Sequence, residues 1–226
     1  MKLELIETKN YHGQAAKFYV RPGNDTEIIN DVRIRNFYLD KGFGVFNPGD
    51  IVIDIGAHIG AFSIECAIRG AKVLAFEPDP ENFKILKKNI EVNGFENIIS
   101  VYDLAVSNFT GTAELYKDSK NNGSHSLIKG CIDNGISGSL KVETISLDDI
   151  LLNYDSCKLI KLDCEGAEYG ILQGSNLNKV EKITCELHDR DKSPGLVKYL
   201  ENCGFEATWH FGKRLGKLQG VKKNTI

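Results

Sequence analysis

The sequence predicts an α/β fold, with a mostly parallel, doubly wound sheet that carries helices on both faces. Short, almost uninterrupted apolar runs alternate with longer segments whose apolar residues recur at helical spacing. Strands that are apolar on both sides are typical of parallel sheets buried between two helical layers. The chain has 226 residues, enough for one domain with its own core. We therefore expect a single domain over residues 1–226, with a Rossmann-like core over 50–226 and a small N-terminal extension over 1–49.

The individual elements follow from apolar runs and from helix-capping residues. The expected core strands are residues 51–55, 72–76, 98–102, 159–162 and 182–187. The expected helices are residues 61–69, 80–93, 147–153, 167–173 and 193–203. Asp79 before Pro80 is a favourable helix start, and Ser146 followed by Asp149 resembles a capping box.

Residues 105–145 break this alternation and predict an insertion. Residues 112–117 and 141–145 have strand character, and a polar, glycine-rich stretch separates them, so we expect a β-hairpin. Near the C-terminus, residues 205–211 indicate a late strand, and the basic side chains after it are expected to form a solvated face. These basic residues are Lys213, Arg214, Lys217, Lys222 and Lys223.

Composition and charge disfavour several classes of protein. The formal net charge of −3 provides no general attraction to nucleic acid or to an anionic membrane. No apolar run approaches the ~20 residues of a membrane span, and the N-terminal stretch MKLELIETKN lacks the pattern of a signal peptide. The six cysteines are scattered without a C-x-x-C pair, which favours buried thiols over zinc ligands or disulfides. We expect a cytoplasmic protein with no membrane span and no nucleic-acid partner.

The stretch DIGAHIGAF, residues 54–62, directly follows the first core strand. Gly56 and Gly60 predict a tight turn in which the backbone approaches a ligand. They do not form the G-x-G-x-x-G of dinucleotide-binding enzymes, and the chain lacks the G-K-[S/T] of a P-loop. Asp54 at this strand end would repel a pyrophosphate, so it favours a ligand with an amine or another positive centre.

Two more acids end the next two strands. Glu77 follows the second strand, where a carboxylate is suited to accept both hydroxyls of a ribose. Asp103 follows the third strand and is a candidate partner for the edge of an adenine. One acid for an amino-acid head group and one for a ribose describe S-adenosylmethionine better than NAD.

Several segments, in this order, closely resemble the FkbM family of methyltransferases. The main ones are residues 52–60 (VIDIGAHIG), 76–80 (FEPDP) and 161–168 (KLDCEGAE). Residues 105–107, 146–148 and 186–188 continue the resemblance, which covers about residues 50–190. It implies a class I, Rossmann-like methyltransferase fold and S-adenosyl-L-methionine as the methyl donor. It also implies a hydroxyl acceptor on a small molecule, such as a saccharide or a natural product.

The candidate cofactor-binding residues lie at the ends of the expected strands. They are Asp54, Gly56, Ala57, His58, Gly60, Glu77, Pro78, Asp103, Leu104, Ala105 and Asp163. His58 is expected to contact the donor through its backbone. The residues expected to contact the acceptor are Glu165 and His125, the latter on the polar loop of the insertion.

Methyl transfer to an alcohol needs alignment, exclusion of water and a base for the hydroxyl proton. Asp163 and His188, at the ends of the fourth and fifth strands, are the predicted catalytic residues. Strand alternation places Glu186 on the same side as His188. For Glu165, a second candidate role besides contact with the acceptor is to stabilise the backbone amides at the start of the next helix. These side chains are of the kinds that bind magnesium or manganese, but their spacing does not demand a metal, and none is assigned.

Three other functions compete with O-methylation. N-methylation of an amine or amide is one, although the Asn/Asp-Pro-Pro-aromatic motif of many base-modifying methyltransferases is absent from the sequence. An NAD-dependent oxidoreductase is another, and the missing glycine fingerprint argues against it. A nucleoside-binding module that has lost catalytic activity is the third. The intact acids at 54, 77 and 163 argue against such a loss of activity.

Overall fold

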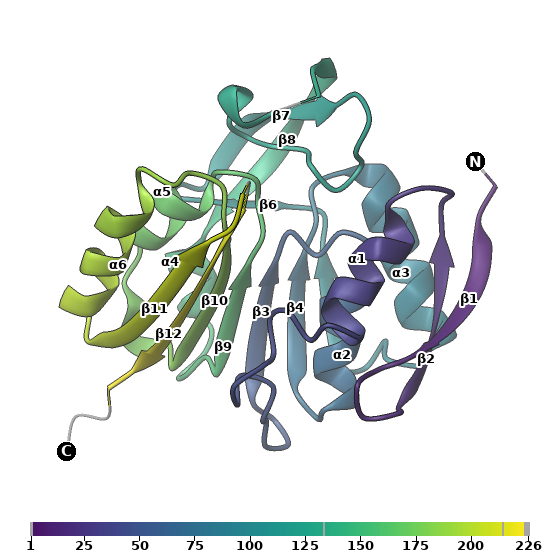
Figure 1. Ribbon diagram of the computed structural model, residues 1–226, viewed down its shortest axis with the longest axis horizontal. Coiled ribbons are helices and arrows are strands. Elements are labelled where there is room, and N and C mark those ends of the chain that lie inside the picture. The colour runs from purple at the N-terminus through teal and green to yellow at the C-terminus, as the bar shows by residue number, and fades with distance from the viewer. Residues whose placement is uncertain (1, 133, 214, 224–226) are drawn as a thin grey trace.

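The structure, a computed structural model, describes residues 2–132, 134–213 and 215–223. Its centre is a seven-stranded sheet. Its strands are β3 (Ile51–Ile55), β4 (Lys72–Phe76), β5 (Ile99–Tyr102), β9 (Leu159–Leu162), β10 (Lys182–Leu187), β11 (Phe205–Phe211) and β12 (Gly216–Lys222). Their order across the sheet is β11-β12-β10-β9-β3-β4-β5 (Figure 1). The five strands from β10 to β5 are parallel, whereas β12 is antiparallel to both of its neighbours.

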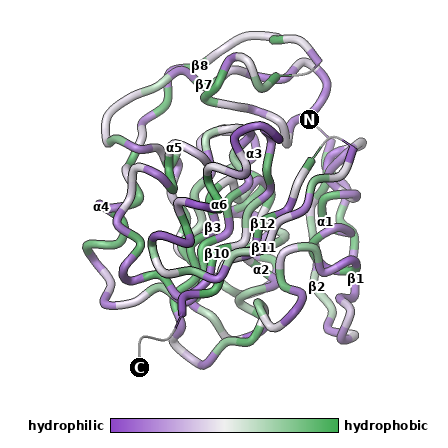
Figure 2. Tube along the Cα trace, turned by 60° about the vertical axis from the view of Figure 1, so that its left-hand side comes forward, coloured by the Kyte–Doolittle hydropathy of each residue, from purple (hydrophilic) through white to green (hydrophobic). Residues whose placement is uncertain are grey.

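Helices cover both faces of this sheet, as predicted. They are α1 (Asp25–Arg33), α2 (Ala61–Ile68), α3 (Pro80–Val92), α4 (Leu147–Leu151), α5 (Glu168–Gln173) and α6 (Ser193–Asn202), with short 3-10 helices at Lys129–Cys131 and Leu177–Lys179. Val52 packs in the core cluster that contains α1, α2 and α3, and its neighbour Ile53 packs in the cluster that contains α4, α5 and α6. Alternate residues of one strand thus serve two cores, which explains its continuous apolar sequence. Figure 2 shows the hydrophobic residues gathered in the interior strands.

The N-terminal segment contributes more to the core than the sequence indicated. β1 (Glu4–Lys9) and β2 (Ala15–Val20) form an antiparallel hairpin, and Phe18 and Ile29 are fully buried in the same cluster as the core strands. The segment after β2 leads directly into α1, which was not predicted. Arg21 and Asp25 form a buried ion pair there, with 2.8 Å between Nη2 and Oδ1.

The insertion forms a separate three-stranded sheet. β6 (Ala105–Ser107) is parallel to β8 (Ile136–Ser146), which is antiparallel to β7 (Gly111–Asp118), so the predicted hairpin is confirmed. This sheet lies above the ends of the central strands to which the arrowheads point in Figure 1. It therefore stands over the edge where α/β proteins bind ligands.

The C-terminal segment corrects one prediction and confirms another. β11 forms where a late strand was predicted, but the basic tail is largely a strand, β12, instead of a solvated face. Lys217 is buried, and its Nζ lies 2.6 Å from Asp40 Oδ1, whereas Arg214 lies outside the described residues. All six cysteines are free thiols, and no helix in the described ranges is long and apolar enough to cross a membrane.

Candidate active site

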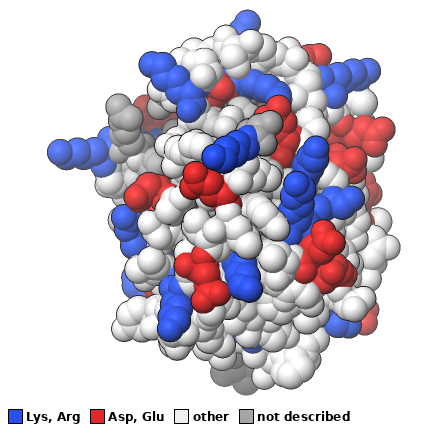
Figure 3. Space-filling model, turned by 90° about the vertical axis from the view of Figure 1, so that its right-hand side faces the viewer, with Lys and Arg blue, Asp and Glu red and all other residues white. Residues whose placement is uncertain are grey.

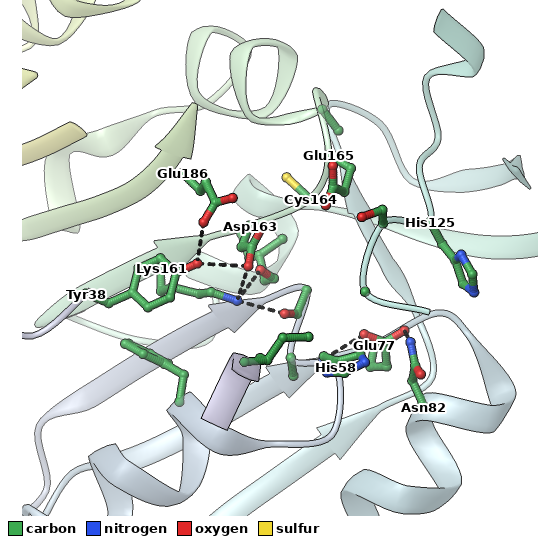
Figure 4. A pocket seen from close by; sticks show the side chains of 18 of the residues that line it. Tyr38, His58, Glu77, Asn82, His125, Lys161, Asp163, Cys164, Glu165 and Glu186 are labelled. Carbon is green, nitrogen blue, oxygen red and sulfur yellow. Dashed lines mark hydrogen bonds and ion pairs between the residues drawn. The ribbon is translucent and has the colours of Figure 1, made fainter. Parts of the chain in front are cut away.

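A cavity of about 560 Å³ opens at the carboxyl ends of β3, β4, β9 and β10. The strand ends form its floor, the insertion closes one side and the segment around α1 closes another. Its volume lies within the range of small-molecule sites. Figure 4 shows the polar side chains that line it, in two groups around Glu77 and around Asp163.

Both glycines of the turn after β3 are required, but by neighbouring protein atoms. Gly56 has φ +77°, and a Cβ atom there would lie 1.9 Å from the carbonyl oxygen of Asp163. Gly60 has φ +92°, and a Cβ atom there would lie 2.6 Å from Leu86 Cδ1 of α3. The turn therefore lets β3 approach the end of β9 and lets α2 approach α3. Gly56 and Ala57 line the cavity, whereas Gly60 lies outside its lining.

Glu77 lines the cavity at the end of β4, where the prediction put a ribose-binding acid. Its Oε2 accepts the backbone N–H of His58 at 2.8 Å, and its Oε1 accepts that of Asp79 at 2.9 Å. Burial raises the pKa of Glu77 to about 7, although these amide hydrogen bonds favour the ionised form. A carboxylate offers about four acceptor positions, so capacity for a ligand hydroxyl remains. Pro78, the next residue, also lines the cavity.

His58 is a neutral part of the wall beside Glu77. Burial lowers its pKa to about 4, and its Nε2 lies 2.9 Å from Arg21 Nη2. Its backbone N–H, which was expected to contact the donor, is bonded to Glu77. His58 thus fixes the Glu77 carboxylate.

Asp54 is fully buried below the cavity, outside its lining. Ser63 Oγ donates to its Oδ2 at 2.6 Å, and the ammonium of Lys161 lies 3.2 Å from its Oδ1. Asp54 and Lys161 are register partners on the neighbouring strands β3 and β9. The direct ligand contact predicted for Asp54 is therefore replaced by a positioning role, since this carboxylate holds Lys161 in place.

Of the three predicted cofactor-binding residues after β5, only one lines the cavity. Asp103 is exposed, and Leu104 packs against the core cluster around α4 to α6, both outside the cavity lining. Ala105 does line the cavity. The predicted contact of Asp103 with an adenine and the predicted cofactor contact of Leu104 are therefore not supported, because neither residue lines the cavity.

Asp163 and Glu186, at the ends of β9 and β10, form the acidic wall of the cavity. Tyr38 approaches both from the N-terminal segment, with its hydroxyl 2.9 Å from Asp163 Oδ2 and 3.0 Å from Glu186 Oε2. Burial, together with the charge of Asp163, raises the pKa of Glu186 to about 8. Asp163 thus lies where a catalytic residue was predicted, in a wall where negative charge is concentrated.

His188 is surrounded by carboxylates behind that wall. Its Nδ1 lies 3.1 Å from Glu168 Oε1, and its Nε2 lies 3.1 Å from Glu165 Oε2 and 3.7 Å from Glu186 Oε1. Burial alone would lower its pKa, but Glu165 and Glu168 raise it to about 12. The geometry therefore does not support His188 as a general base, which would require a free imidazole that faces the cavity.

The two predicted acceptor contacts, Glu165 and His125, lie on different sides of the cavity. Glu165 belongs to the acidic side and pairs with His188. His125 lies on the Glu77 side in Figure 4, with its Nε2 3.8 Å from Asp79 Oδ2. In the same loop, the Asn122 carbonyl accepts from Asn82 Nδ2 at 3.0 Å. The insertion loop thus lies beside Glu77 and Asn82 through His125 and Asn122, while its Ser126 hydroxyl donates to the carbonyl oxygen of Glu165 on the acidic side.

Several polar residues that line the cavity, among them Tyr38, Asn82, Lys161 and Glu186, were not among the predicted site residues. Lys161 carried a sequence signal, because a lysine inside an otherwise apolar core strand needs a buried acidic partner. Tyr38 carried none, since it reaches Asp163 from a segment 125 residues away in the chain.

Comparisons with known proteins agree with this architecture. The family model described as the methyltransferase FkbM domain matches residues 54–207. The chain is 28% identical over 180 residues to the hexuronic acid methyltransferase AglP of Haloferax volcanii, covering 78% of this chain and 72% of that protein. It is 25% identical over 236 residues to the 31-O-demethyl-FK506 methyltransferase FkbM of Streptomyces tacrolimicus, covering 89% of this chain and 90% of that protein.

Shorter and more distant matches add to the fold assignment. The chain spans only 22% of the length of a tRNA (guanine(37)-N(1))-methyltransferase of Candida albicans, to which it is 33% identical over 111 residues, 49% of this chain. The crystal structure of precorrin-6Y C5,15-methyltransferase of Geobacter metallireducens superimposes with a TM-score of 0.53 at 11% identity, covering 84% of this chain and 88% of that one. The sheet, the cavity at its carboxyl edge and the match over residues 54–207 lead to one conclusion: the chain belongs to the FkbM family of methyltransferases and has the class I fold of S-adenosylmethionine-dependent enzymes.

Proposed function

We propose that this methyltransferase transfers the methyl group of S-adenosyl-L-methionine to a hydroxyl of a small molecule, such as a saccharide or a natural product. The observation that carries the proposal is the division of one cavity into two sides. Glu77 stands at the end of β4, and Asp163 and Glu186 stand at the ends of β9 and β10. One side suits a ribose, and the other suits a polar acceptor.

The Glu77 side fits the nucleoside part of the donor. Its carboxylate is held by two backbone amides and keeps acceptor capacity toward the cavity. Apolar side chains around it, among them Phe76, Val106 and Leu127, provide surface for a flat base. S-adenosylmethionine supplies an already activated methyl group, so the protein has to orient the acceptor, exclude water and accept one proton.

The Asp163 side meets the needs of a hydroxyl acceptor. Lys161 and Tyr38 fix the direction of the Asp163 carboxylate, with Lys161 Nζ 3.8 Å and the Tyr38 hydroxyl 2.9 Å from the same oxygen, Oδ2. Carboxylates directed at the acceptor can bind its O–H group as hydrogen-bond acceptors. Two relatives support a hydroxylated substrate by their names, one acting on a hexuronic acid and one on 31-O-demethyl-FK506.

We also propose a cytoplasmic enzyme that does not act on nucleic acid. The net charge of −3 and the six free thiols support this proposal. Figure 3 shows acidic and basic side chains interspersed over one face of the molecule, without a continuous basic patch on that face. An interspersed surface attracts a phosphate backbone weakly.

Thermal unfolding with separate ligands tests the donor first. S-adenosylhomocysteine and S-adenosylmethionine are expected to raise the melting temperature, since a ligand at a hundred times its Kd adds about 2.7 kcal/mol of stability. NAD, the control, is expected to leave it unchanged. A shift with NAD alone would overturn the proposal.

A transfer assay with labelled donor then tests the acceptor class. Saccharides and hydroxylated natural products are the expected acceptors, while amines and tRNA are the contrasting substrates. Label in an amine or in tRNA, with none in any hydroxylated compound, would replace O-methylation by N-methylation or by RNA modification.

A further inference from the structure

We propose that Asp163, Glu186 and His188 form a binding site for a divalent cation of the magnesium or manganese class, beside the place of the acceptor. Each of these residues offers one ligand atom, and the three atoms lie within 4.8 Å of one another. With bonds of about 2.1 Å, two ligands of octahedral Mg²⁺ lie about 4.2 Å apart when they are opposite and about 3.0 Å apart when they are adjacent. A small closing movement therefore gives a suitable coordination distance.

Negative charge is concentrated around this site. Four carboxylates, those of Asp163, Glu165, Glu168 and Glu186, surround the His188 ring or its neighbours. The His188 ring, when protonated, and Lys161 compensate part of this charge. The Lys161 ammonium lies closer to Asp54, at 3.2 Å, than to Asp163, at 3.8 Å. Clustered acids removed from water require a compensating positive charge, and a divalent ion supplies it.

The His188 ring provides an observation that is independent of the acids. Its side chain is only 7% exposed, and within the described chain its Nε2 has no hydrogen-bond partner, although the Glu165 carboxylate lies 3.1 Å away as an ion pair. This buried nitrogen is directed at Glu165 and Glu186. A cation there occupies the place that a proton on Nε2 otherwise takes.

The surrounding contacts orient all three ligands. Glu168 Oε1, fully buried, accepts the backbone N–H of His188 at 3.0 Å and lies 3.1 Å from Nδ1, which leaves Nε2 as the ligating nitrogen. A carboxylate on the far ring nitrogen is the usual support of a metal-binding histidine. Tyr38 contacts Asp163 Oδ2 and Glu186 Oε2, so one oxygen of each carboxylate is held and the other remains for the ion.

The site also narrows the acceptor class, a step that rests on the proposed function. Asp163 and Glu186 line the cavity and His188 lies behind them, so the open coordination positions face the cavity. Magnesium keeps several positions for water or substrate oxygen. An acceptor with two neighbouring oxygen atoms, such as a sugar diol, would chelate the ion and present one hydroxyl for methylation.

Titration with Mn²⁺, followed by the electron paramagnetic resonance signal of the free ion, tests the site without acceptor or donor. We expect one ion per chain in the wild type and a loss of affinity of at least about tenfold in Asp163→Asn and in Glu186→Gln. Asp103→Asn, which removes the same charge from an exposed residue outside the cavity, is the matched control and is expected to bind like the wild type.

The outcomes separate this proposal from the proposed function. Absence of Mn²⁺ binding by the folded wild type, checked by circular dichroism, overturns the cation site whatever the variants do. Binding that Asp163→Asn and Glu186→Gln leave unchanged places the ion elsewhere and also overturns it. A thermal shift with S-adenosylhomocysteine in the same preparation shows whether the donor site is intact, so failure of the cation site is distinguishable from failure of the methyltransferase proposal.

Discussion

At the Glu77 side of the cavity two backbone amides hold the carboxylate, whereas at the Asp163 side four carboxylates gather around His188 and Lys161. On the first side, Glu77 binds the backbone of His58 and Asp79, 19 and two residues away, within two consecutive βα units. The second joins Tyr38 to Asp163 and Glu186 over 125 and 148 residues. The carboxylate that we propose for donor binding is thus held by nearby backbone, whereas the carboxylates that we propose for the acceptor are held by a residue from a distant segment.

The largest expected effect comes from Gly56→Ala, because Gly56 lies directly against the backbone of Asp163 at the end of β9. The change places a Cβ atom 1.9 Å from the Asp163 carbonyl oxygen at a φ of +77°. We expect the free energy of unfolding to fall by about 3 kcal/mol, from backbone strain together with overpacking. Denaturant unfolding measures it.

Gly49→Ala is the matched control for that change. Gly49 has φ +94°, but a Cβ atom there meets nothing within 4 Å, so it reports the strain alone. We expect a loss of about 1 kcal/mol. Equal losses in the two variants would contradict the idea that close contact of β3 and β9 requires Gly56.

Glu77→Ala isolates the donor side. A hydrogen bond to a charged group contributes roughly 1.5–3 kcal/mol, so S-adenosylhomocysteine should bind about 10- to 100-fold more weakly in calorimetry. Glu81→Ala, at an exposed position in the first turn of α3, is the control and should bind normally. Unchanged affinity in Glu77→Ala would remove this carboxylate from the site.

The pH dependence of donor binding sharpens the same assignment. Burial raises the pKa of Glu77 to about 7, with His58 and Asp79 directly beside it and Lys117 and His125 on Asp79. Only the ionised carboxylate accepts from both ribose hydroxyls, so affinity should rise several-fold as the pH passes about 7. The rise should be absent in Glu77→Gln; a rise that persists there would assign it to another group.

The same raised pKa has a stability consequence with a defined sign. The folded protein holds the Glu77 proton more tightly than the unfolded chain does. Its contribution to the free energy of unfolding is therefore present below the ordinary glutamate pKa and is lost as the pH rises toward about 7. Glu77→Gln should flatten this part of the stability profile of the ligand-free protein.

Tyr38→Phe is the smallest change and probes the acceptor side alone. The ring keeps its edge contacts with Phe37 and Phe62, while the bonds to Asp163 and Glu186 are lost. We expect about 1 kcal/mol less stability, an unchanged Kd for S-adenosylhomocysteine and about tenfold slower turnover. A weaker affinity for S-adenosylhomocysteine with normal turnover would place Tyr38 on the donor side and contradict the proposed division of the cavity.

The sequence predicted the alternation of strands and helices well, because a buried parallel strand must be apolar on both faces. β3, β4, β10 and β11 have the predicted bounds, and Asp79 and Ser146 cap their helices as expected. It predicted α1, β1 and β12 poorly. These elements mix polar and apolar residues, and packing against the core determines their structure more than local preference does.

The sequence by itself determined the sheet, the glycine turn and the family, because these depend on periodicity and on motifs within short segments. It also placed Glu77 and Asp163 in the cavity, since residues after parallel strands meet at one edge. Only the tertiary structure decided that Asp54 holds Lys161, that Asp103 faces solvent and that His188 is enclosed by acids. The physical reason is that burial and charge balance depend on residues brought together from distant segments, and no local pattern records those contacts.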